Sequence, residues 1–310
     1  DDVESRGLGD VYKRQIKDYL ISQARLYKGI HDQTLSAINK GYTINELESQ
    51  IRLPKELTEK WYLRPYYGTL SHNSKAVYQK YMGWYDSNPV NLDPLPPIEE
   101  AKNFINYMGG AQKILQKAAE DYQNGNYRWV AKVTNLIVFA EPDNQDARLL
   151  CNKALTQLGY QAESGTWRNE YLTGALELAQ GTIKNPDHYA NGSQDLISHL
   201  TGEMVLNYLS LLTIPSDKQL SGIVVFEDDW TFENGAYKQR SSCYQLDYWR
   251  GILTYFPINS TNLASPEYLY RGNRIPFMNQ LLYTKTEELK EWRQLFEINP
   301  DERYFNIIEP

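Results

Sequence analysis

Apolar residues recur at helical spacing through most of the first 180 residues, which predicts a mainly helical first part. The longest stretch is Ile16–Lys40, where apolar side chains return every three or four positions until Gly41 ends the pattern. Thr43 and Glu46 then have capping-box spacing, with Thr43 as the N-cap of a short helix that ends before Pro54. The chain is therefore expected to begin with one long amphipathic helix and one short helix.

The segment 61–73 is aromatic and lacks helical periodicity. Pro65 and Gly68 interrupt it, so it is predicted to be a loop. Helical spacing resumes at 74–84, and the prolines of the connection 88–97 cannot continue a helix. An aromatic loop is therefore expected directly before a helix.

Several helices of about a dozen residues, joined by short turns, are predicted between residues 98 and 180. They cover Ala111–Asn124, Tyr127–Ala140, Asn144–Leu158 and Trp167–Gln180. The turns at Gly125 and Pro142 are placed as in tetratricopeptide-like (TPR-like) helical hairpins. One clear and one degenerate repeat predict an antiparallel helical module with a surface suited to packing against a second copy.

The pattern changes beyond residue 180. A segment rich in Asn, Asp, Gly and Ser, 181–198, is predicted to be a linker, and Leu200–Leu212 is predicted to be a helix. Short strands follow at 222–226, 230–232 and 236–238, with Asn234-Gly235 as a hairpin turn; the later elements are 244–256, the mostly helical 271–297 and the strand-like 305–308. This part is therefore predicted to be a small α+β domain.

Composition excludes several classes of function. The net charge is −7 and no basic stripe occurs, which argues against a nucleic-acid partner. No apolar run of about 18 residues is present, so no transmembrane segment is expected. Cys151 and Cys243 fit neither a disulfide framework nor a zinc knuckle. Motifs of serine hydrolases, P-loop proteins and dinucleotide-binding enzymes are missing from the sequence, so these readings have no support.

The four histidines lie far apart in the sequence. Hydrolytic zinc sites gather several His and carboxylate ligands, commonly in a short His-rich run, so a dinuclear metal site is not expected in this chain. His31, beside Asp32, is predicted to be a packing or surface residue that pairs locally. No role is assigned to His188 or His199.

His72 has the most suggestive neighbours. Gly68 permits a tight backbone, and Ser71 and Asn73 supply further donors, so an imidazole in this loop can donate to an oxyanion. The alternative is a structural role, in which His72 caps the helix that starts near Ser74. Local sequence alone favours the structural role.

The aromatic neighbourhood of His72 also has two interpretations. Arg64 can bind an anion or stack on Tyr66 or Trp61, and stacking is favoured. The aromatic side chains can line an apolar cleft for a hydrocarbon chain or form ordinary core and interface, and core is favoured. They are Trp61, Tyr62, Tyr66, Tyr67, Tyr81, Trp84 and Tyr85.

The sequence Tyr66-Tyr67-Gly68-Thr69-Leu70-Ser71-His72-Asn73 and its continuation to Asp86 resemble the segment just after the catalytic domain in the SDS-hydrolysing alkylsulfatases of the metallo-β-lactamase superfamily. The similarity continues through 107–111, 125–131, 138–144 and 157–169, and upstream includes 30–34. It covers nearly all of 16–178 and, more weakly, Glu233–Tyr237 and Tyr304–Pro310.

The resemblance implies an N-terminal catalytic domain that binds two zinc ions through a His-x-His-x-Asp-His motif with further Glu and His ligands, and that activates water. A helical dimerisation domain and a sterol-carrier-protein-2-like (SCP2-like) domain, which gathers apolar substrate, follow it. His72 matches the family's sulfate-binding histidine. The last zinc-binding histidine of the family precedes the position of Ile16, so neither a metal ligand nor a catalytic residue is expected in this chain.

The expected organisation follows from this resemblance. Residues 16–60 are assigned to the tail of the catalytic domain, 61–180 to the dimerisation domain, 181–195 to the linker and 196–310 to the SCP2-like domain. Asp1–Gln15 is expected to be an artefact, because Asp10–Gln15 matches a translated transposon adapter. Most of the catalytic domain is therefore expected to be missing.

The parent protein is expected to be a homodimeric, zinc-dependent hydrolase that converts linear primary alkyl sulfates to alcohol and sulfate. The resemblance suggests a periplasmic or secreted location, and this chain alone is expected to be inactive. A rival hypothesis is a stand-alone dimerising helical interaction or lipid-binding module with no catalysis.

Overall fold

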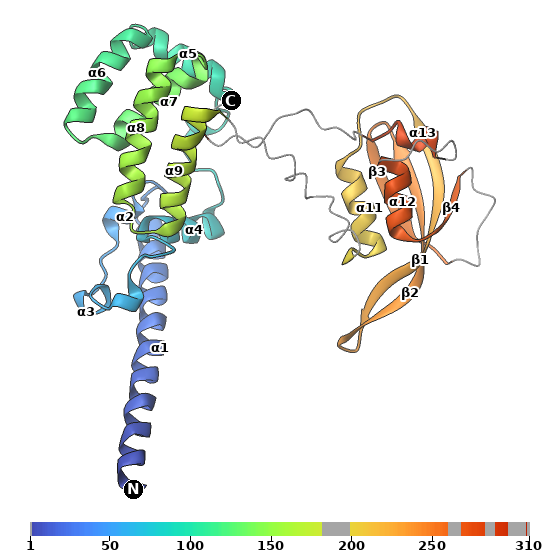
Figure 1. Cartoon of the computed structure of the whole chain (residues 1–310), viewed down its shortest axis with the longest axis horizontal. Helices are drawn as coiled ribbons and strands as arrows, with labels where there is room; N and C mark the ends of the chain where they lie inside the picture. Colours follow the sequence, from blue (N-terminus) through green and yellow to red (C-terminus); the bar gives the residue numbers. More distant parts are fainter. Residues whose placement is uncertain (1, 182–198, 260–267, 283–288, 297–307, 309–310) are drawn as a thin grey trace. The chain divides into compact units, whose positions relative to one another are not determined.

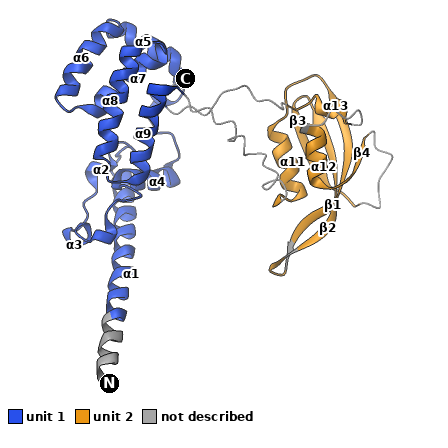
Figure 2. Ribbon diagram, in the orientation of Figure 1, with its two compact units in different colours: residues 1–183, 305–310 blue, residues 184–304 orange. Residues whose placement is uncertain are grey.

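The structure is a computed structural model that describes residues 2–181, 199–259, 268–282, 289–296 and 308. Two compact units divide the chain, one formed by residues 1–183 with 305–310 and the other by 184–304 (Figure 2). The first is helical, and the second combines helices with a four-stranded sheet. This confirms a helical domain followed by a small α+β domain. Apart from Gly181, the predicted linker 181–195 lies outside the described residues, and the finer domain division stays a prediction.

The first unit begins with α1 (Asp2–Asn39), a helix of 38 residues that includes the predicted Ile16–Lys40 except for its last residue. Its N-terminal end extends away from the rest of the unit (Figure 1), and Ile16 and Leu20 in its first half are exposed. Its C-terminal half contributes buried residues such as Ile30. Among its described side chains, the helix therefore has a buried face only in its second half.

Three short helices follow α1: α2 (Leu47–Gln50), α3 (Lys55–Thr58) and the 3-10 helix η1 (Trp61–Leu63). The predicted capping box is only half formed. Oε2 of Glu46 accepts from the Thr43 backbone N–H at 2.9 Å, but α2 begins at Leu47 and has Glu46 as its N-cap. The prediction of Thr43 as N-cap is therefore wrong, because the Thr43–Glu46 contact closes a turn before the helix.

After α4 (Leu70–Met82) and the 3-10 helix η2 (Pro89–Asn91), five antiparallel helices follow. They are α5 (Pro97–Tyr107), α6 (Ala111–Gln123), α7 (Tyr127–Ala140), α8 (Gln145–Gln161) and α9 (Gly165–Gln180). The predicted bounds agree with the last four within a few residues. Val130 and Ile137 of α7 are fully buried and pack with Cys151 and Ala154 of α8 and with Leu178 of α9. The apolar periodicity of these helices thus forms one continuous core.

The sequence pattern predicts that α8 ends before Gly159. In the structure the helix continues to Gln161. Gly159 is buried, and a Cβ atom there would lie 2.7 Å from Cδ2 of Leu172 on α9. This glycine therefore allows α8 and α9 to approach closely and does not terminate the helix.

Cys151 gives the helical unit a predictable pH dependence. Burial raises the pKa of its thiol from 9.0 to about 11. Below pH 9 the thiol is neutral in both folded and unfolded chains, whereas between pH 9 and 11 it ionises only when unfolded. The free energy of unfolding is therefore expected to fall by up to about 2.7 kcal/mol across this window.

Urea unfolding at pH 8 and pH 11 of the natural chain and of Cys151→Ala measures this term, because every other titrating group is common to both proteins. The natural chain is expected to lose more stability than the variant on going to pH 11. Equal losses would contradict the assignment to Cys151.

The first helix with described bounds in the second unit is α11 (Gly202–Leu211). The strands β1 (Gln219–Glu233), β2 (Ala236–Trp249), β3 (Ile252–Pro257) and β4 (Leu269–Gly272) follow it. The strand order is β3-β2-β1-β4, with β1 antiparallel to β2, β2 antiparallel to β3, and β4 parallel to β1. Helices α12 (Arg274–Leu282) and α13 (Lys290–Arg293) follow. The core contains Leu206, Phe226, Tyr248, Phe277 and Met278, each at most 2% exposed.

Asn234-Gly235 forms the predicted hairpin turn, with φ angles of 53° and 80°. The short strands predicted at 222–226, 230–232 and 236–238 are instead parts of the long strands β1 and β2. The register shifts between Phe226 and Asp229, so a bulge breaks the alternation that the sequence pattern relies on. The predicted helical stretch 271–297 is helical at α12 and α13, and 283–288 lies outside the described residues.

Of the predicted terminal strand 305–308, only Ile308 is described. The carbonyl of Ile308 accepts a hydrogen bond from Nδ2 of Asn135 at 2.8 Å. Its side chain packs on the helical core beside Gly174, where a Cβ atom would lie 3.7 Å from the Cβ of Ile308. Ile308, near the C-terminus, thus contributes to the first unit.

Candidate functional site

His72 lies in the first turn of α4 (Leu70–Met82) and is exposed. Thr69 is the N-cap, and its Oγ1 accepts from the His72 backbone N–H at 3.0 Å. The helix therefore begins before Ser74, and the prediction of an unbroken loop over 61–73 is wrong at η1 and from Leu70 onward. The prediction that His72 caps the helix is also wrong, because Thr69 is the N-cap and the imidazole does not take part in capping.

The surroundings of His72 combine a close backbone approach with a ring partner that is distant in sequence. A Cβ atom at Gly68 would lie 2.7 Å from Oδ1 of Asn73, so the tight backbone expected at this glycine accommodates that side chain. Nε1 of Trp167, in the first turn of α9, donates to Nδ1 of His72 at 3.3 Å. The sequence analysis missed Trp167, and no local pattern connects it to His72.

Arg64 adopts the structural role that the sequence favoured. Its guanidinium carbon lies 5.8 Å from the centre of the Tyr66 ring, which confirms the stacking prediction. Its NH2 also forms an ion pair with Oε1 of Glu163 at 2.5 Å. Arg64 thus joins the segment before α4 to the turn between α8 and α9.

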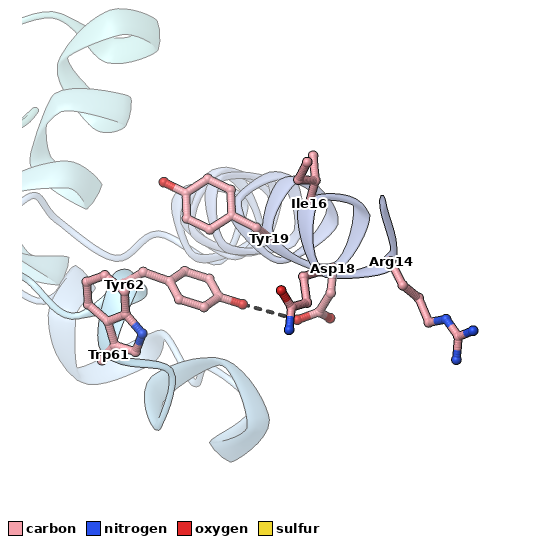
Figure 3. Close-up of a pocket in the computed structure, with 7 residues that line it drawn as sticks. Arg14, Ile16, Asp18, Tyr19, Trp61 and Tyr62 are labelled. Atoms are coloured by element: carbon pink, nitrogen blue, oxygen red, sulfur yellow. Dashed lines mark hydrogen bonds between the residues drawn. The ribbon is translucent and has the colours of Figure 1, made fainter. Parts of the chain in front are cut away.

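The aromatic residues near His72 do not form the predicted core. Trp61 is 73% exposed, Tyr67 is 80% exposed and Trp84 is 71% exposed, because no described element of this unit packs over them. Trp61 and Tyr62 instead line an open groove of about 760 Å³ with the N-terminal half of α1 (Figure 3). Only Trp61 and Tyr62 of the seven aromatic residues line this groove, so the hydrocarbon cleft stays a prediction.

Charged side chains lie along this groove. Nζ of Lys60 contacts Oδ2 of Asp18 at 2.7 Å, and the Tyr62 hydroxyl donates to the same oxygen at 3.2 Å (Figure 3). The hydrogen bond from Lys60 lowers the pKa of Asp18, and the same bond raises the pKa of Lys60. Because these partners are 42 residues apart, sequence spacing gave no sign of them.

His31 has side-chain partners other than His72. His31 pairs through Nδ1 with Oδ1 of Asp32 at 3.1 Å, as predicted, and its Nε2 lies 2.9 Å from the Tyr81 hydroxyl. Hydrogen bonds from Lys28 and then His31 lower the pKa of Asp32. His199 belongs to the second unit, and His188 lies outside the described residues.

The described part of the chain contains no group of three His, Cys, Asp or Glu side chains that could hold a metal ion. The donors needed for the two zinc ions implied by the resemblance are therefore not found among these residues. Nor is any described helix long and apolar enough to cross a membrane.

The helical fold of the first unit and the His72 segment agree with a known class of domain. Residues 43–181 match the family described as alkyl sulfatase dimerisation. These residues therefore form an alkyl sulfatase dimerisation domain, and the chain is homologous to alkyl- and aryl-sulfatases.

Three relatives show how far the similarity extends. The alkyl/aryl-sulfatase BDS1 of Saccharomyces cerevisiae is 49% identical over 220 residues, which are 71% of this chain and 33% of that protein. A linear primary-alkylsulfatase of Pseudomonas sp. is 45% identical over 64% of this chain and 29% of its own length. The solved stereoselective inverting sec-alkylsulfatase Pisa1 from Pseudomonas sp. is 32% identical, with a TM-score of 0.81, over 95% of this chain and 47% of that chain. The chain thus spans about a third of these curated relatives and less than half of the solved one.

Proposed function

We propose that this chain is the C-terminal part of a zinc-dependent alkylsulfatase that hydrolyses linear primary alkyl sulfates, such as dodecyl sulfate, to alcohol and sulfate. The match of 43–181 to the alkyl sulfatase dimerisation family carries this proposal. The 45% identity to a protein named linear primary-alkylsulfatase supports the substrate class. The chain would supply a TPR-like dimerisation domain, a sulfate contact and an SCP2-like domain for apolar substrate.

The zinc ions and their ligands are assigned to the part of the parent protein that precedes the matched region. The described residues offer no metal-binding cluster, so no step of the hydrolysis is assigned to a metal held by this chain. The role left for this chain in the chemistry is to bind and orient the sulfate group. The chain alone is therefore expected to be inactive.

His72 is the residue proposed to make that contact. A sulfate ester presents oxygens that share one negative charge, and an imidazole N–H is a suitable donor to such an oxygen. The exposed position of His72 in the first turn of α4 leaves the ring accessible to a substrate held by a neighbouring domain. A fixed donor of this kind stabilises negative charge that develops during ester cleavage.

Release of sulfate from dodecyl sulfate tests the proposal. A protein that contains both this chain and the proposed catalytic domain is expected to release sulfate. The chain alone is expected to release none. Turnover by the chain alone, with stoichiometric zinc in a metal analysis, would overturn the assignment. Absence of turnover in the longer protein would favour the interaction or lipid-binding module.

The dimer is the second part of the proposal. Phe104, Tyr107 and Met108 are 47%, 90% and 37% exposed, and their spacing places them on one face at the end of α5. Exposed apolar patches of this kind are typical of interfaces. Inside a domain of the alkyl sulfatase dimerisation family, the partner proposed for this face is a second copy of the chain.

Tyr107→Glu is expected to weaken the dimer about tenfold or more, because an interface aromatic residue is replaced by a charge. Sedimentation velocity at micromolar concentration measures the change. Tyr160→Glu is the matched control, since Tyr160 is 70% exposed on α8 of the same unit. A natural chain that is already monomeric, or equal effects of the two substitutions, would contradict this interface.

A further inference from the structure

The ring of His72 contacts the side chain of Trp167, and this contact determines which ring nitrogen can donate a hydrogen bond. Nε1 of Trp167 lies 3.3 Å from Nδ1 of His72, and the two ring centres are 6.3 Å apart at an interplanar angle of 66°. The indole is therefore placed edge-on, with its N–H directed at one particular nitrogen. The contact joins the first turns of α4 and α9, which are 95 residues apart in sequence.

The position of Trp167 is fixed by the turn between α8 and α9. Ser164 is 1% exposed, and its Oγ, as the N-cap of α9, accepts from the Trp167 backbone N–H at 3.3 Å. On its other side Trp167 meets the Tyr171 ring edge-on, with ring centres 6.3 Å apart. Contacts with residues of its own helix and N-cap therefore fix the position of the indole independently of His72.

The same turn also holds the segment that leads into His72. The Gly165 backbone N–H donates to the Tyr66 carbonyl at 2.8 Å. The hydroxyls of Ser164 and Thr166 donate to the Tyr67 carbonyl at 2.6 and 2.8 Å. Both partners of the indole–imidazole contact therefore belong to one hydrogen-bonded assembly.

The chemistry of the contact permits only one arrangement of protons. An indole nitrogen is a donor and cannot accept, so Nδ1 of His72 must offer its lone pair. A neutral imidazole with an acceptor at Nδ1 carries its proton on Nε2. The indole of Trp167 therefore makes Nε2–H the donor of His72.

We propose that Trp167 is a positioning residue that selects the Nε2–H tautomer of His72 and aims this N–H at a sulfate oxygen of the substrate. The second half of this statement rests on the proposed function, whereas the first half concerns the chain alone. Phenylalanine at 167 keeps a ring in place but has no donor, so Trp167→Phe removes the selection while it preserves most of the packing.

Nitrogen-15 NMR of the imidazoles in the full chain, in alkaline buffer where histidine is neutral, reads the tautomer directly. The natural chain is expected to show His72 mainly with its N–H at Nε2. In Trp167→Phe the ratio of Nδ1–H to Nε2–H is expected to rise about fivefold, the ratio that a neutral hydrogen bond of about 1 kcal/mol supports. Trp129→Phe is the matched control, since Trp129 is half exposed on α7 of the same unit.

A natural chain in which Nδ1–H is the main form, or an unchanged ratio in Trp167→Phe, would overturn the proposal. A purely structural role would move the unfolding midpoint of the variant without changing the tautomer. In the sulfate-releasing parent protein, Trp167→Phe is expected to lower kcat/KM by less than about fivefold, because a fivefold change in the tautomer ratio removes only part of the Nε2–H form. If His72→Ala leaves sulfate release unchanged, the sulfate contact fails, whereas the tautomer measured in the chain still tests the positioning by itself.

Discussion

Asp229→Ala is expected to lower the free energy of unfolding of the second unit by about 3 kcal/mol or more. Asp229 is 2% exposed, and its Oδ1 accepts from the backbone N–H groups of Gly202 at 2.6 Å and Trp230 at 2.7 Å. The hydroxyl of Ser242 donates to its other oxygen. Alanine leaves the buried N–H of Gly202 and the part-buried N–H of Trp230 without this acceptor, and the loss at a buried N–H costs about 1–3 kcal/mol.

The position of this carboxylate adds to the effect. Gly202 is the first residue of α11, so the negative charge lies at the positive end of the helix. A Cβ atom at Gly202 would lie 2.5 Å from Oδ2 of Asp229 and 2.6 Å from a ring carbon of Phe226. Gly202→Ala should therefore destabilise the same unit, because the helix would have to move away from the carboxylate.

Urea unfolding followed by tryptophan fluorescence measures the loss, and hydrogen exchange of the Gly202 and Trp230 amides locates it. Asp247→Ala is the matched control, since Asp247 is an exposed aspartate on β2 of the same sheet. Asp229→Asn keeps an acceptor for the amides and should be intermediate. Equal destabilisation by Asp229→Ala and Asp247→Ala would refute the role assigned to the buried carboxylate.

Sequence periodicity was sufficient for the helical core and insufficient where one residue changes the local geometry. Helices α6 to α9 could be predicted because buried positions such as Val130 and Ile137 recur along one face, between residues that break helices. Gly159 looks in the sequence like the glycines that end helices, yet it lies within α8 against Leu172. The two cases differ only in tertiary packing, which periodicity does not contain.

The strands and the aromatic segment illustrate two other limits. The bulge between Phe226 and Asp229 shifts the alternation of β1, so one long strand looks like two short ones. Trp61, Tyr67 and Trp84 are apolar enough for a core, but composition does not show whether a partner element covers them. In the described unit they remain exposed.

The candidate site could be found in part from sequence. His72 was identified because its neighbours resemble those of the alkylsulfatase family, although local rules favoured a helix cap. Trp167 could not be found this way, since its importance comes from a contact across 95 residues. The tautomer of His72 is therefore a property of the fold and not of the motif.

His72→Ala, in the parent protein that contains this chain, is expected to lower kcat/KM for dodecyl sulfate at least about 100-fold, or about 2.7 kcal/mol of transition-state stabilisation. The proposed reason is the loss of a fixed N–H donor to a sulfate oxygen. Dimer formation is expected to remain unchanged and the free energy of unfolding to fall by no more than about 1 kcal/mol, because only the hydrogen bond from Trp167 is lost and Thr69, not His72, caps α4.

Initial rates of sulfate release against substrate concentration, with unfolding and sedimentation of each variant, measure these effects separately. His31→Ala is the matched control, since its ring is bound to Asp32 and Tyr81 away from the proposed contact. His72→Gln retains a donor on a flexible side chain and should recover only part of the rate. Full activity of His72→Ala would remove the sulfate contact from this chain, while a loss shared with His31→Ala would point to a general change in α4 and its neighbours.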